Sequence, residues 1–264
     1  MVRNMVFENL DEAWKAINRS FLVEPGNTLD YIRGSQGMVE DLIVKVRKPE
    51  CSLNLNEVAF TPKSKWTHLI SSYIDPEDYY DFWERVNKVT GTSYQFRFRE
   101  RKGPNGPCLI ALVLTREDSK HPWTRAKIIW RTAELQRKFA ADLVLIHHFF
   151  KDIPEGCGDK IDIQEVTLYL AQAFQSWRLV GPLVPLFCEW DEVDTEHDFG
   201  RRMKNTYDTI YNADPQPEMK FAPVIRMQAH HLRIQKGEIE YSHPDELSLS
   251  GEIARLSKRR KKDV

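Results

Sequence analysis

Cys108 is the residue best suited to covalent chemistry in this sequence, because a thiolate is a strong nucleophile. It follows a dense turn cluster at residues 102–107 and opens the apolar run LIALVLT, which predicts a buried strand. A cysteine at such a turn-to-strand junction can face a cleft. The alternative is a small core residue, which is the commoner role of a cysteine beside an apolar strand.

Arg131 and Thr132 end one predicted strand and precede a predicted helix. A guanidinium, a hydroxyl and the N–H groups of a first helical turn can together hold a phosphate. Thr132 fits equally well as the N-cap of that helix, beside a surface arginine. The local pattern leaves both interpretations open.

Asp142 lies at the margin of an apolar stripe that predicts an amphipathic helix over residues 134–150. A carboxylate in this place is costly unless it has a partner. It either forms a salt bridge, for example to Arg137 or Lys138, or lines a ligand pocket where desolvation keeps it protonated. The stripe, within roughly 40° of one helix face, consists of Leu135, Phe139, Leu143, Ile146 and Phe150.

The other residues whose side chains could take part in chemistry are expected to have structural roles. His147 and His148 are adjacent, so their side chains point about 100° apart on a helix, and no H-x-x-x-H motif accompanies them. We therefore expect no metal site. The basic run at residues 258–262 is expected to belong to a frayed, solvated tail. Most tryptophans are expected in the core: Trp66, Trp83, Trp123, Trp130, Trp177 and Trp190.

Composition excludes several classes of protein. Lys and Arg number 38 against 39 Asp and Glu, so no overall field favours nucleic acid or a membrane surface, and any anion site must be local. Four cysteines without C-x-x-C spacing indicate a reducing, cytoplasmic compartment. The charged N-terminal segment and the lack of a long apolar run argue against a signal peptide and a membrane span.

The elements that must position these residues can be predicted from periodicity. The 264 residues suit one domain with α-helices and β-strands. We expect helices over 10–21, with Asn9 or Asp11 as cap, from Asp75-Pro76 onward, and over 195–213. We expect strands over 38–46, 93–100, 109–115 and 126–130, a helix or strand-to-helix passage over 166–180, and extended chain over 222–241. Residues 50–65 are expected to be irregular.

Taken together, GPC at 106–108, WRTAEL at 130–135 and Asp142 resemble the active-site stretch of thymidylate synthases and pyrimidine-nucleotide hydroxymethylases. In that family a proline-cysteine nucleophile precedes a strand leading to Arg-Ser-x-Asp. Eleven residues after its arginine, at Asp142 here, stands the residue that reads the pyrimidine edge. The uracil enzymes carry Asn there, and the cytosine hydroxymethylases carry Asp. Arg33-Gly34 is similar to the family's phosphate loop, and the resemblance covers roughly residues 10 to 180.

The sequence departs from the family pattern at several positions. Arg-Ser-x-Asp appears as residues 131–134, RTAE, and the residue before it is Trp130 in place of Gln. The family's His-x-Tyr sugar contact is absent from AQAFQSW at 171–177, where Gln172 or Gln175 are the polar substitutes. The family's active-site Glu has no clear counterpart; the nearest residues are His68, Glu57 and Glu84.

The resemblance implies an α+β fold with a thymidylate synthase-like large twisted mixed β-sheet, flanking helices and a homodimer joined through the sheet. Residues 1–255 would form the domain and 256–264 a basic tail. Cys108 would add to C6 of CMP or dCMP, and C5 would take a hydroxymethyl group from 5,10-methylenetetrahydrofolate. The implied nucleotide-binding residues are Arg33, Arg131, Thr132, Asp142 and Gln172, with Glu134 on the folate side.

Two alternatives stay open at this point. A thymidylate synthase acting on dUMP would share the mechanism, although it would need Asp142 to read uracil. A degenerate member would bind a nucleotide or a partner protein without catalysis, as the absent His-x-Tyr suggests.

Overall fold

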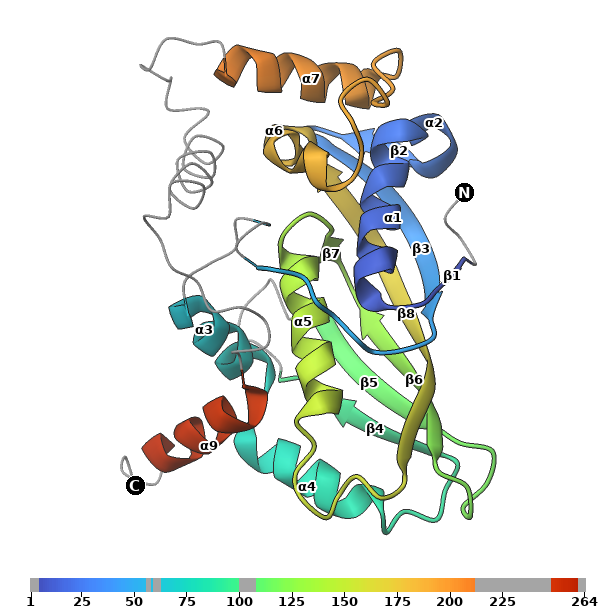
Figure 1. The fold of residues 1–264 in the computed structure, drawn as a ribbon, viewed down its shortest axis with the longest axis vertical. Helices are drawn as coiled ribbons and strands as arrows, with labels where there is room; N and C mark the ends of the chain where they lie inside the picture. The colour runs from blue at the N-terminus through green and yellow to red at the C-terminus, as the bar shows by residue number, and fades with distance from the viewer. Residues whose placement is uncertain (1–4, 56–57, 59–62, 100–107, 212–247, 261–264) are drawn as a thin grey trace.

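A mixed sheet of eight strands, flanked by helices, forms the centre of the structure (Figure 1). The structure is a computed structural model that describes residues 5–55, 58, 63–99, 108–211 and 248–260. The helices and the mixed sheet within these ranges confirm the expected α+β class. Within them, no helix combines the length and the apolar character that a bilayer-spanning segment requires.

The order of strands across the sheet is β1-β3-β8-β6-β5-β4, with β2 paired to β3 and β7 paired to β8. The pairs β1 with β3, β6 with β8 and β7 with β8 are parallel, and the other pairs are antiparallel. The strands are β1 Val6–Phe7, β2 Tyr31–Arg33, β3 Gln36–Val46, β4 Ser93–Arg97, β5 Leu109–Thr115, β6 Trp123–Trp130, β7 Ala133–Glu134 and β8 Ile161–Ser176.

Two of the predicted helices begin at the expected caps. The Asn9 side chain accepts a hydrogen bond from the Glu12 N–H (2.9 Å) at the start of α1, and the Asp75 side chain accepts one from the Glu77 N–H (3.0 Å) at the start of α4. The helices are α1 Leu10–Val23, α2 Pro25–Thr28, α3 Lys63–Tyr73, α4 Pro76–Val86, α5 Lys138–Lys151, α6 Trp177–Val180, the 3-10 helix η1 Gly181–Leu186, α7 Asp198–Tyr211 and α9 Leu249–Arg260.

Helices α1 and α5 cover one face of the sheet, and the main core lies between them and the strands (Figure 1). Ten of the fourteen residues of α5 are buried, which accounts for its nearly continuous apolar sequence. The expected core role is confirmed for five of the six tryptophans, since Trp66, Trp83, Trp123, Trp130 and Trp177 are buried. Trp190 is only partly buried.

At one level of the sheet, the alternation of buried and outward-pointing side chains along the strands is interrupted. Residues three apart in a regular strand point to opposite faces, yet Val39 and Leu42 of β3 are both buried in the core, as are Leu170 and Ala173 of β8. Asp41, between the first two, has a positive φ of 49°. The same spacing separates Trp130 from Ala133, across the break between β6 and β7.

Next to this level, β5 shifts its register between Leu109 and Ala111. The irregular segments therefore align across the neighbouring strands β3, β8, β6 and β5. Cys108, Arg131, Thr132 and Gln172 all lie on or beside this irregular level, which is where a sheet re-aims its side chains.

Several expectations about the elements are wrong. Helix α5 begins at Lys138 and not at residue 134, because Ala133 and Glu134 pair with Ala173 and Phe174 of β8. Helix α3 already begins at Lys63, within the segment expected to be irregular. The expected strand-to-helix passage over 166–180 is confirmed, since β8 runs to Ser176 and α6 follows at Trp177–Val180. The chain after Leu256 is helical as far as Arg260, and Leu256 packs on the core. The expected extended segment at 222–241 lies outside the described residues.

Candidate functional site

Cys108 and Arg131 lie side by side at the ends of neighbouring strands. The Arg131 N–H donates a hydrogen bond to the Cys108 carbonyl (2.8 Å), directly after the paired residues Leu109 and Trp130. Cys108 is half-buried at the edge of the core, whereas Arg131 is exposed. The structure thus makes backbone neighbours of two residues that are 23 residues apart in the chain. Gly106 and Pro107 lie outside the described residues.

Asp142 is anchored by the residue that precedes Arg131. The Trp130 indole N–H donates to Oδ2 of Asp142 over 3.0 Å, and both side chains are buried. The neighbouring Phe139 ring packs edge-on against Trp130, at 5.2 Å between ring centroids. A carboxyl oxygen can accept a second hydrogen bond. Asp142 is therefore held next to the strand that carries Arg131.

The expected phosphate-binding helix start beside Thr132 is wrong. Thr132 is followed by β7, and α5 begins six residues later with Arg137 as its N-cap. The N–H groups of the first turn of α5 therefore do not adjoin Arg131 and Thr132. What remains beside Cys108 is the backbone of the exposed Arg131, which the half-buried Thr132 follows in the chain.

Glu134 supports the start of α5. Its Oε1 accepts a hydrogen bond from the Arg137 N–H (3.2 Å), and its Oε2 lies 3.5 Å from a guanidinium nitrogen of Arg137. The side chain is only 6% exposed. This geometry explains why a carboxylate is tolerated at this buried position, and it gives Glu134 a structural partner within its own turn.

Gln172 belongs to a polar cluster that the sequence did not reveal. Its side-chain amide donates to the Tyr31 hydroxyl (2.8 Å), which in turn donates to Glu40 (3.1 Å). Gln172 and Glu40 are paired residues of β8 and β3. No periodicity in the sequence signals Tyr31, because its partner Gln172 is 141 residues away.

Arg33 ends the same hairpin, in which Gly34 takes the positive φ of 58° that a tight two-residue turn requires. Burial and Glu40 raise the pKa of the Tyr31 hydroxyl, and the Arg33 charge opposes this increase. Arg33 pairs with Gln36, four residues along β3 from Glu40, which corresponds to roughly 13 Å. The hairpin thus places Arg33 near Tyr31 rather than directly beside Arg131.

Gln175 has a structural role, which separates it from Gln172. It is fully buried, and its amide donates to the Asn18 side chain (2.8 Å). Asn18 in turn donates to the carbonyls of Trp14 and Leu135. This network ties α1 to β8 and to the segment between β7 and α5. Of the two glutamines that the sequence offered, only Gln172 has a partly exposed side chain.

The remaining residues whose side chains could take part in chemistry do not lie beside Cys108 and Arg131. His148 is buried against Trp66 and Asp152, and His147 contacts the backbone at Pro49 and Cys51. His68 and Glu84 are exposed on α3 and α4, and Glu57 lies outside the described residues. Among the described residues, no three His, Cys, Asp or Glu side chains lie close enough together to hold a metal ion.

Comparison with known proteins adds no assignment. No protein-family model matches this chain, and no curated protein sequence matches it.

Proposed function

We propose that the chain binds a pyrimidine nucleoside monophosphate and activates C5 of a cytosine base through the thiolate of Cys108. The observation that carries this proposal is the hydrogen bond from the Arg131 N–H to the Cys108 carbonyl. It supports a site in which a nucleophile and an anion-binding side chain start from adjacent backbone positions. The resemblance to thymidylate synthases and pyrimidine hydroxymethylases assigns these two residues the same roles.

The proposed base contact is Asp142. With Oδ2 already accepting from Trp130, a protonated Oδ1 would donate to N3 of cytosine, and a carboxyl oxygen would accept from the 4-amino group. Uracil presents the opposite pattern of donors and acceptors. Cytosine is therefore the favoured base, and a thymidylate synthase acting on dUMP is the weaker alternative.

The proposed phosphate contacts are Arg131 and Thr132, with Arg33 and Gln172 further along the sheet. Arg131 and Arg33 are exposed, and Thr132 is half-buried, so both guanidiniums can reach an anion in solution. A guanidinium can bind a phosphate through two parallel hydrogen bonds. Gln172 is held by Tyr31 and would contact the sugar from there.

The proposed chemistry is a conjugate addition. The Cys108 thiolate forms a bond from Sγ to C6 of the base, and the electron pair of the C5–C6 double bond moves to C5. C5 then takes a proton from water, and loss of the original C5 hydrogen with expulsion of the thiolate restores the base. This sequence is balanced without a cofactor and leads to exchange of hydrogen at C5.

For the one-carbon donor, the resemblance proposes 5,10-methylenetetrahydrofolate beside Glu134. The geometry of Glu134 does not fit that role, because its carboxylate is buried and bonded to Arg137. This observation favours a second candidate function, in which the chain binds a nucleotide, or a partner protein, without completing a transfer.

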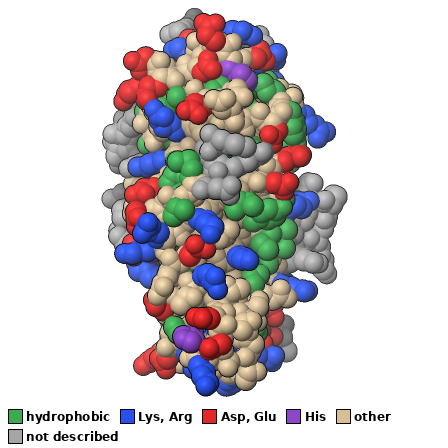
Figure 2. Space-filling model, turned by 90° about the vertical axis from the view of Figure 1, so that its right-hand side faces the viewer, with side chains coloured by type: hydrophobic (Ala, Val, Ile, Leu, Met, Phe, Trp, Pro, Cys, Tyr) green, Lys and Arg blue, Asp and Glu red, His purple; other side chains and the backbone are tan. Residues whose placement is uncertain are grey.

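We further propose that two chains associate through the sheet face that α1 and α5 leave uncovered. Figure 2 shows the side of the molecule that lies to the right in Figure 1. Hydrophobic side chains gather near the middle of this side among charged ones. On β5 and β6 the residues of this uncovered face alternate with the buried ones. They include Ile110, Val113 and Ile129. Ile110 is 40% exposed. An isologous dimer would cover this apolar strip.

Release of tritium from C5-labelled CMP, dCMP and dUMP, with and without a reduced folate, tests the proposed function. Release from CMP or dCMP, exceeding that from dUMP, is the expected result. Release from dUMP alone would support a thymidylate synthase. Nucleotide binding without any release would support the non-catalytic candidate, and no binding at all would reject the proposal. Sedimentation equilibrium of the wild type and of Ile129→Asp tests the dimer, which the variant should dissociate.

A further inference from the structure

The outer edge of β4 is open in the described part of the chain. β4 is the last strand of the sheet and pairs only with β5 among the described strands. The Phe98 N–H donates to the Ile110 carbonyl and the Arg116 N–H donates to the Thr92 carbonyl. In an antiparallel pair, the residues that alternate with bonded ones turn their backbone groups outward. Gln95 and Arg97 therefore direct their N–H and C=O groups away from the sheet.

The position of Arg99 supports this orientation. It follows the same alternation as Gln95 and Arg97, and its N–H donates outward to the carbonyl of Tyr73, the last residue of α3 (2.6 Å). The outward edge is thus closed by α3 at Arg99. An edge of this kind is a template for one more strand.

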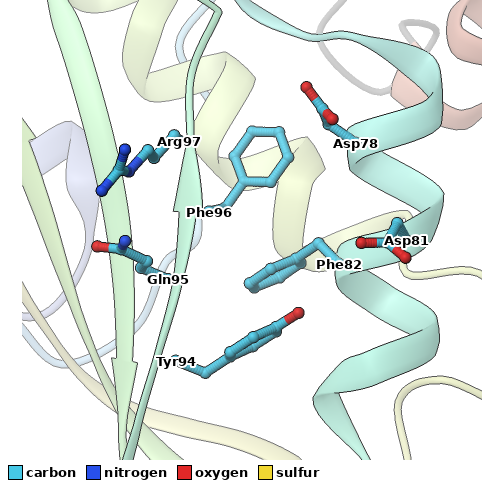
Figure 3. A pocket seen from close by; sticks show the side chains of 7 residues that line it. All are labelled: Asp78, Asp81, Phe82, Tyr94, Gln95, Phe96 and Arg97. Atoms are coloured by element: carbon cyan, nitrogen blue, oxygen red, sulfur yellow. The ribbon is translucent and has the colours of Figure 1, made fainter.

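A cavity of about 310 Å³ lies along this edge, between β4 and α4 (Figure 3). The aromatic rings of Phe82, Tyr94 and Phe96 line its inner side, with Phe82 and Tyr94 stacked at 5.0 Å between centroids. The side chains of Gln95 and Arg97 point away from α4, so their backbone is what the cavity meets. The groove therefore combines outward backbone groups with aromatic surface.

The opposite lip of the groove is acidic. Asp78 and Asp81 of α4 lie across the cavity from β4 (Figure 3), and both are exposed. The helix sequence PEDYYDFWERV carries four carboxylates against one arginine, and that arginine, Arg85, pairs with Asp81 at 2.7 Å. Burial and the Asp81 charge raise the pKa of Tyr94 in the same groove. This lip complements a cation and repels a phosphate or a nucleic acid.

We propose that this groove binds an extended segment of a partner protein, which adds to the outer edge of β4 as a strand and places a lysine or arginine side chain against Asp78 and Asp81. The outward N–H and C=O groups of Gln95 and Arg97 bind the backbone of the segment, which is the mode known as strand addition. The cation lies between the two carboxylates and the partly exposed ring of Tyr94, where both attractions act together. This surface is separate from the proposed nucleotide site at Cys108.

The test is a selection from a random dodecapeptide library displayed on phage, with the full chain as bait. Peptides that carry lysine or arginine at alternating positions should be enriched, and a fluorescein-labelled copy of the strongest one gives a Kd by anisotropy. The double variant Asp78→Asn, Asp81→Asn should weaken this binding at least tenfold. The control Glu189→Gln, an exposed carboxylate before α7 at the opposite end of the molecule from α4 (Figure 1), should leave it unchanged.

Two backbone measurements complete the test. Gln95→Pro should weaken peptide binding at least tenfold whereas Gln95→Ala should not, because only proline removes the outward N–H without breaking a bond to β5. Amide exchange at Gln95 and Arg97 should slow when the peptide is bound. Failure to enrich basic peptides, or unchanged binding in the double variant, would overturn the proposal. Protection of these amides that depends on protein concentration alone would show a second copy as the occupant, and would equally overturn it.

Discussion

The indole N–H of Trp130 donates to Oδ2 of Asp142 at 3.0 Å, within a part of the core where neither side chain is more than 3% exposed. This bond joins the last residue of β6 to the second turn of α5. It therefore fixes the carboxyl group relative to the strand end that carries Arg131. Both the stability of this region and the proposed reading of the base depend on it.

Replacing the donor should destabilise the fold. In Trp130→Phe, the buried carboxyl of Asp142 loses the hydrogen bond from the indole, which costs about 1–3 kcal/mol in addition to the lost volume. Urea denaturation of the single variants Trp130→Phe and Asp142→Ala and of the double variant gives the coupling energy. We expect the effects to be clearly non-additive. Additive losses would show that the hydrogen bond contributes nothing to stability.

The same carboxyl should set base preference. An amide at position 142 can donate to O4 of uracil and accept from its N3–H, so Asp142→Asn should shift the ratio of CMP to UMP affinities at least tenfold toward uracil, since each mismatched polar group costs about 1–3 kcal/mol. Titration calorimetry with both nucleotides on both proteins measures this ratio. An unchanged ratio would remove Asp142 from the base-binding site.

Helices and strands were predictable from the sequence where the signal is local. Asn9 and Asp75 cap the helices that their positions predicted, and the apolar run after Cys108 is β5 over its whole length. The start of α5 was not predictable, because Ala133 and Glu134 leave the helical pattern to pair with β8, forty residues further along the chain. Local propensity carries no information about such a partner.

The candidate site was predictable only in part, for the same reason. The resemblance placed Cys108 and Arg131 in one site, and their backbone hydrogen bond shows that they are neighbours. The attachment of Asp142 to Trp130 and of Gln172 to Tyr31 depends on which strands lie side by side. A carboxylate at position 134 appeared to suit a ligand, whereas its partner is the backbone of Arg137 three residues later.

Arg131 should act on the phosphate and not on the base. A charge-assisted contact contributes on the order of 1.5–3 kcal/mol, so Arg131→Ala should weaken CMP binding at least tenfold and leave cytidine binding nearly unchanged. The matched control is Arg125→Ala, since Arg125 is an exposed arginine earlier on β6. Equal losses for nucleotide and nucleoside would contradict a phosphate contact.

His147 should make stability depend on pH. Burial, and then the neighbouring His148, lower the pKa of His147 below its ordinary value, and the Cys51 N–H donates to its Nδ1 at 3.2 Å. The unfolded chain therefore binds this proton more readily than the folded chain, so this contribution to stability is lost as the pH falls below about 6.5.

Comparing urea unfolding at pH 7.5 and pH 5.5 isolates this effect. The free energy of unfolding should drop less between the two pH values in His147→Gln than in the wild type. The exposed His68 provides the control variant His68→Gln, which should keep the wild-type slope. A slope unaltered in His147→Gln would assign the pH dependence to other groups.

The measurement that tests the central claim most directly is release of tritium from C5-labelled CMP and dCMP by Cys108→Ser. The control is Cys157→Ser, because Cys157 is also half-buried but lies in a turn after α5, and burial raises the pKa of its thiol. Cys108→Ser should abolish release while binding the nucleotide within about a factor of ten of the wild type, since only the covalent step needs a thiolate. Cys157→Ser should release tritium at the wild-type rate. Release by Cys108→Ser at the wild-type rate would contradict the proposed role of Cys108.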